Sequence, residues 1–172
     1  MLQGRQPCRD LLRQTLCDLA PNLGRASAGG NLPDAHAVNA ARELWLIDRV
    51  FENWPLDDPA VLESLSTWLR PAGRTLHLVG ADFNTMARAY PRFARWRRDW
   101  SHGMEVVSPV DGLLTGCPRG LLAGPVALML LDAPDWRLQR VSDSSHLRAF
   151  QTQCADFLQR CEPAWAVTTL GL

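Results

Sequence analysis

The chain has 172 residues, of which 47% are hydrophobic and 21% are charged, and its formal net charge is zero. This composition supplies enough apolar surface for one folded domain and argues against intrinsic disorder. All 18 basic residues are arginine. Chemistry that needs a lysine side chain, such as Schiff-base catalysis or phosphate binding by a P-loop lysine, is therefore excluded.

The N-terminal residues do not resemble a secretory signal, because arginines interrupt the leucines there. The longest apolar run, residues 121–131, contains a Gly-Pro pair and is shorter than the roughly 20 residues of a membrane span. We therefore expect a cytoplasmic protein that does not cross a membrane. The five cysteines lack a C-x-x-C pair and the four histidines are scattered, so we expect no disulfide framework, no metal site and no cofactor.

The first predicted element is a short amphipathic helix over residues 7–20, which ends at Pro21. The next stretch, residues 22–34, is rich in glycine, alanine, serine and asparagine, which is typical of a flexible linker. These features predict an N-terminal helix and linker over residues 1–35, outside a single α/β domain over residues 36–172.

The middle of the chain alternates strands with helices. Three apolar segments are predicted strands: residues 44–47, 75–79 and 104–107. The helix between the first two starts at Asp57 or Asp58, and the helix between the last two is kinked or split at Pro91. This order is typical of a parallel sheet with right-handed crossovers.

The second half of the chain has a different pattern. Two predicted strands, residues 126–131 and 136–141, flank a turn-rich sequence and indicate an antiparallel hairpin. A closing helix follows, capped by Ser142 or Asp143. The predicted fold class is α/β: a three-layer mixed sheet with a parallel βαβαβ first half, an antiparallel hairpin and a closing helix.

Two aspartates follow the first two predicted strands, at the sheet edge where ligands of α/β proteins bind. With His102, which lies in a predicted loop, Asp48 and Asp82 are candidates for an acid–base enzyme site. The alternative is structural: Asp82 begins a helix and Asp48 pairs with a nearby arginine. We favour the structural interpretation, because no second catalytic motif accompanies the aspartates.

Four arginines recur at helical spacing and are candidate phosphate ligands: Arg88, Arg92, Arg95 and Arg98. Such a helix face binds phosphates in nucleic-acid-binding proteins, but charged helix faces are more commonly just solvated. Because the net charge is zero, we do not expect nucleic acid to be a partner.

Three segments carry a resemblance to a known family: L-W-L-I-D-R-V-F-E-N-W-P-L-D from Leu44, A-R-A-Y-P-R-F-A-R-W-R-R-D-W-S-H from Ala87, and P-A-W-A-V-T-T-L-G-L from Pro163. They resemble an uncharacterised proteobacterial family distantly related to the phospholipase D-like fold. The resemblance implies a phospholipase D-like half domain in a bacterial protein.

Active phospholipase D-like enzymes use a histidine and a lysine separated by one residue, with an aspartate further on. This chain has no lysine, and residues 113–131, where that motif is expected, lack histidine. The resemblance therefore implies a degenerate, non-catalytic binding or assembly module. Because such half domains pair, it also implies a homodimer or another protein partner.

Overall fold

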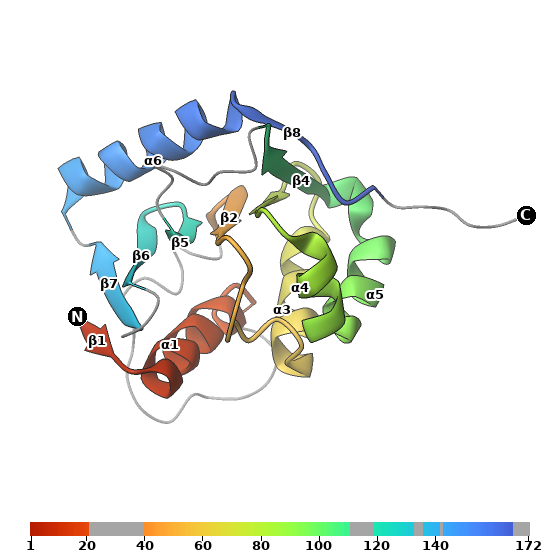
Figure 1. Ribbon diagram of the computed structural model, residues 1–172, viewed down its shortest axis with the longest axis horizontal. Helices are drawn as coiled ribbons and strands as arrows, with labels where there is room; N and C mark the ends of the chain where they lie inside the picture. The colour runs from red at the N-terminus through yellow and green to blue at the C-terminus, as the bar shows by residue number, and fades with distance from the viewer. Residues whose placement is uncertain (21–39, 111–118, 133–135, 142, 167–172) are drawn as a thin grey trace, which may run out of the picture.

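The computed structural model describes residues 1–20, 40–110, 119–132, 136–141 and 143–166. Within these ranges the chain forms one mixed sheet of eight strands in the order β1-β7-β6-β5-β2-β3-β4-β8, with five α-helices. Helix α6 covers one face of the sheet, and α1, α3, α4 and α5 cover the other (Figure 1). The predicted mixed α/β sheet between two helical layers is confirmed.

The centre of the sheet is parallel, as the sequence predicts. Its strands are β2 (Glu43–Ile47), β3 (Thr75–Val79) and β4 (Met104–Pro109), and β3 pairs in parallel with both neighbours. The inner strands are apolar on both faces because helices cover both sides. On β2, Leu46 packs toward α1 and α3, whereas Trp45 packs in the cluster beneath α6.

Helix α3 (Pro59–Leu69) connects the first two of these strands and starts where the sequence places it. The side chain of Asp58 accepts a hydrogen bond from the backbone N–H of Ala60, and Pro59 occupies the first helical position. Val61, Leu65 and Trp68 form its buried side.

The second connection contains two helices, α4 (Phe83–Ala89) and α5 (Pro91–Asp99), followed by the 3₁₀ turn η1 (Ser101–Gly103). Pro91 ends α4 because it has no N–H to donate and because its ring clashes with the preceding turn. The Asp57 carboxylate then accepts hydrogen bonds from the backbone N–H groups of Arg92 and Phe93, which caps the new helix. The predicted split at Pro91 is confirmed.

The antiparallel half contains β5 (Arg119–Ala123), β6 (Val126–Asp132) and β7 (Arg137–Val141), followed by α6 (Ser144–Leu158). The predicted β6–β7 hairpin is confirmed, and Asp143 caps α6. The sequence analysis missed β5, which pairs with β6 across the Gly124–Pro125 turn and also with β2. β5 thereby joins the two halves of the sheet.

The first 20 residues pack against the rest of the chain, although the predicted domain begins at residue 36. Strand β1 (Leu2–Gln3) pairs with β7, and α1 (Arg5–Cys17) buries Cys8, Leu12 and Leu16 in the main core. The predicted linker lies outside the described residues. At the opposite edge of the sheet, β8 (Cys161–Pro163) pairs with β4.

Candidate functional site

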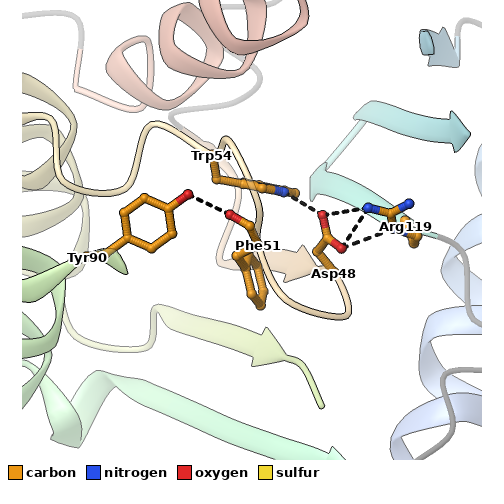
Figure 2. Close-up of polar contacts among 5 residues, drawn as sticks. All are labelled: Asp48, Phe51, Trp54, Tyr90 and Arg119. Atoms are coloured by element: carbon orange, nitrogen blue, oxygen red, sulfur yellow. Dashed lines mark hydrogen bonds and ion pairs between the residues drawn. The ribbon is translucent and has the colours of Figure 1, made fainter. Parts of the chain in front are cut away.

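Asp48 follows β2 directly and is completely buried. Its carboxylate accepts a hydrogen bond of 2.7 Å from the Trp54 indole N–H. It also accepts three contacts from Arg119: one of 3.0 Å from Nε, and two of 2.8 and 3.0 Å from Nη2 (Figure 2). Both carboxylate oxygens are therefore occupied by donors, and the buried charge is neutralised.

The loop after Asp48 folds back through two residues in left-handed conformations, Phe51 at φ 55° and Asn53 at φ 60°. This turn brings the Trp54 indole to the Asp48 carboxylate (Figure 2). The Tyr90 hydroxyl donates a 2.6 Å hydrogen bond to the Phe51 carbonyl, and burial raises the pKa of Tyr90. The loop is thus fixed from both ends by side-chain hydrogen bonds.

Gly120 follows Arg119 at the start of β5 and allows β5 to approach β6 closely. Its φ is 149°, and a Cβ there would lie only 1.9 Å from the Leu128 carbonyl oxygen. Only glycine permits this close approach between β5 and β6. The neighbouring Arg119 side chain contacts Asp48 and is 26% exposed.

Asp82 lies at the same end of the sheet, where its backbone N–H donates to the Arg49 carbonyl. Its side chain is exposed and caps α4 through hydrogen bonds from the Thr85 hydroxyl at 2.6 Å and the Thr85 N–H at 2.9 Å. These bonds, with the Thr85 hydroxyl as the main cause, hold the pKa of Asp82 below its ordinary value.

His102 does not join the two aspartates. It lies in η1, which precedes β4, whereas Asp48 and Asp82 follow β2 and β3. Because the three strands are parallel, the start of β4 is at the opposite end of the sheet. The structure therefore places Asp48 and Asp82 at the same end of the sheet, with one side chain buried and the other exposed, and His102 at the opposite end.

The four candidate phosphate ligands, Arg88, Arg92, Arg95 and Arg98, are all exposed, and we refer to them as the arginine surface. Arg88 belongs to α4 and the other three to α5, so the single helix face expected from the sequence is divided at Tyr90. Among the described residues, none of the four forms an ion pair.

Arg97, which also belongs to α5, is different. Its side chain is buried, its guanidinium carbon lies 4.3 Å from the centre of the Trp165 ring, and its Nη2 donates to the Trp165 carbonyl. Burial lowers the pKa of Arg97. Helix α5 therefore directs this arginine into the core and the rest of its basic residues to solvent.

Other kinds of site were also sought. No three His, Cys, Asp or Glu side chains gather as metal ligands in the part of the chain that the structure describes. None of its described helices combines the length and apolarity of a membrane span. An open depression of about 350 Å³ lies beside the start of β2, lined by Trp45, Leu122, Gln151 and their neighbours, and includes no candidate site residue.

No protein-family model matches the chain, and no curated protein matches it. Among solved structures, the fold is similar to that of TrmBL2, an archaeal chromatin protein whose structure is described as showing a novel mode of DNA binding. The TM-score is 0.52 and the sequence identity is 11%. The match covers 92% of this chain and 64% of that protein. The likeness concerns the fold.

The similar protein is described as DNA-binding, which runs against the expectation that nucleic acid is not a partner of this chain. That expectation rested on the zero net charge, which averages over the whole chain and hides the distribution of charge on the surface. The arginine surface consists of exposed cations on two consecutive helices, whereas the Asp48 carboxylate is buried in the core. The net charge of the whole chain therefore does not describe the local charge of the arginine surface.

Proposed function

We propose that this protein is a non-catalytic nucleic-acid-binding module that contacts phosphates through the arginine surface. The observation that carries the proposal is the exposed side of α5. It presents three arginines, Arg92, Arg95 and Arg98, against one acidic residue, Asp99, and none of the arginines forms an ion pair with a described residue.

The spacing of these arginines suits a phosphate backbone. Arg92 and Arg98 are separated by a rise of about 9 Å along the helix, which corresponds to two or three phosphates of one B-form strand. A guanidinium binds a phosphate through two parallel hydrogen bonds and keeps its charge at any physiological pH. Because the net charge is zero, such binding depends on these local contacts and weakens steeply with salt.

The fold comparison supports the proposal, because the similar archaeal protein is described as DNA-binding. The absence of catalysis is supported by the contacts of the aspartates. The Asp48 carboxylate accepts hydrogen bonds from Arg119 and Trp54, and the Asp82 carboxylate caps α4. We also retain the phospholipase D-like half domain in a bacterial, cytoplasmic protein as a proposal that rests on the family resemblance. Pairing with a second copy rests on the same resemblance.

The test is binding of a fluorescent oligonucleotide to the double variant R92Q/R95Q. The matched control is R148Q/R160Q, which removes two exposed arginines in and after α6, on the other face of the sheet. Both variants change the net charge equally. The proposal predicts that only R92Q/R95Q weakens binding markedly. Equal weakening by the two variants, or no binding by the wild type, would overturn it.

A further inference from the structure

A row of stacked rings runs from the core to the surface beside the arginine surface. Phe93 stacks on Trp96 at 5.4 Å between ring centres, Trp96 on Trp100 at 6.3 Å, and Trp100 on His102 at 5.9 Å. The angles between successive planes are 29°, 26° and 29°. Phe93 is buried, both tryptophans are half-buried, and His102 is exposed.

The row is held in place by hydrogen bonds from three elements. The Trp96 indole N–H donates to the Ser66 hydroxyl of α3 at 2.7 Å. In η1, the Gly103 N–H donates to the Trp100 carbonyl, and the Ser101 hydroxyl donates to the Arg98 carbonyl. His102 is thereby positioned next to the last turn of α5, which carries Arg98.

His102 is the outermost ring of the row. Trp100 stacks with His102, and the His102 side chain is exposed, so the row ends at the protein surface. Single-stranded nucleic acids bind through bases stacked on aromatic or histidine rings, combined with cations that contact the backbone. Bases in a duplex are already stacked on each other and cannot add to such a row.

We infer that the arginine surface selects single-stranded nucleic acid, and that one unpaired base stacks on the outer face of His102 as the next ring of the row. Arg95 and Arg98 then contact the flanking phosphates. This inference rests on the proposed function and adds the strandedness of the ligand and the position of one base. The stack requires no base-specific hydrogen bond, so the base at this position is not restricted to one type.

The experiment compares an oligothymidylate with a duplex of the same length, using H102A and the control H146A. His146 is also an exposed histidine, but it lies in α6. The wild type is expected to prefer the single strand. H102A is expected to weaken single-strand binding about fivefold, the low end for loss of one stacked base, without changing the salt dependence. H102A is expected to bind the duplex as the wild type does. H146A is expected to bind the single strand as the wild type does.

The two proposals fail in different ways. If R92Q/R95Q weakens binding but H102A matches H146A, or if the duplex binds as tightly as the single strand, this inference is wrong and the proposed function stands. If neither nucleic acid binds, both fail. Trp100→Leu provides a second test of the row, because it keeps an apolar side chain below His102 while it removes the ring that supports it.

Discussion

Asp48 and Arg119 form an ion pair that joins the parallel half of the sheet to the antiparallel half. Asp48 follows β2, Arg119 begins β5, and the two residues are 71 positions apart in the chain. The two partners are unequally buried, because the Asp48 side chain is fully buried whereas that of Arg119 is 26% exposed.

This difference in burial predicts which of the two substitutions lowers the free energy of unfolding more. Arg119→Met leaves a buried carboxylate without its cation and is expected to lower the free energy of unfolding by about 3–5 kcal/mol. Asp48→Asn is expected to lower the free energy of unfolding less, because the partly exposed Arg119 guanidinium can turn toward solvent. Urea denaturation of both variants measures the difference, and a larger loss for Asp48→Asn would contradict this account.

Tyr90 is expected to stabilise the loop after Asp48 through its hydrogen bond to the Phe51 carbonyl. Tyr90→Phe keeps the ring in the core and leaves the Phe51 carbonyl with the Trp54 N–H as its remaining donor at 3.3 Å, so the free energy of unfolding is expected to fall by about 0.5–1.5 kcal/mol. The free energy of unfolding from denaturant titration is the measurement. A change below about 0.5 kcal/mol would mean that water or another donor replaces the hydroxyl.

His77 should make stability fall at mildly acidic pH. It is buried, stacks on Trp45 with ring centres 4.1 Å apart, and burial lowers its pKa, although the facing carboxylates of Glu105 and Glu43 oppose this shift. The unfolded chain, with a histidine pKa of about 6.5, therefore takes up a proton before the folded chain does. The free energy of unfolding is then lost as the pH falls below about 6.5.

His77→Phe keeps a ring against Trp45 and removes the titrating group. Its free energy of unfolding should change less between about pH 7.5 and about pH 5.5 than that of the wild type. His146→Ala serves as the control, because His146 is exposed. If His77→Phe loses as much stability as the wild type, another group is responsible for the acid sensitivity.

Asp99 is the acidic residue on the exposed side of α5 and should oppose phosphate binding. Asp99→Asn removes a negative charge next to three arginines, so oligonucleotide affinity is expected to rise about twofold to fivefold at low salt. The gain should shrink as salt is added. A loss of affinity in a fluorescence titration would instead indicate that Asp99 positions an arginine.

Local sequence signals predicted most of the fold. The apolar strands, the Asp58–Pro59 helix start and the break at Pro91 each depend on residues within a few positions of one another. β5 was missed because its residues continue into β6 as one apolar run, and the Gly-Pro turn between them was taken only as an interruption. The role of α1 in the core depends on long-range packing, which periodicity alone does not reveal.

The candidate site was less predictable for the same reason. The sequence predicted that Asp48 could pair with a nearby arginine. Which arginine does so depends on how β5 pairs with β2, because Arg119 lies at the start of β5. His102 lies at the far end of the sheet because it precedes β4, which runs parallel to β3. Arg97 is buried against Trp165, a contact between residues 68 positions apart that local spacing does not reveal.

The most direct test of nucleic-acid binding by the arginine surface is the salt dependence of oligonucleotide affinity for the wild type, R92Q/R95Q and R148Q/R160Q. Each arginine that contacts a phosphate contributes about one unit to the slope of log affinity against log salt concentration. The account predicts that R92Q/R95Q reduces this slope by about two units, while R148Q/R160Q keeps the wild-type slope. Identical slopes for all three proteins would contradict it.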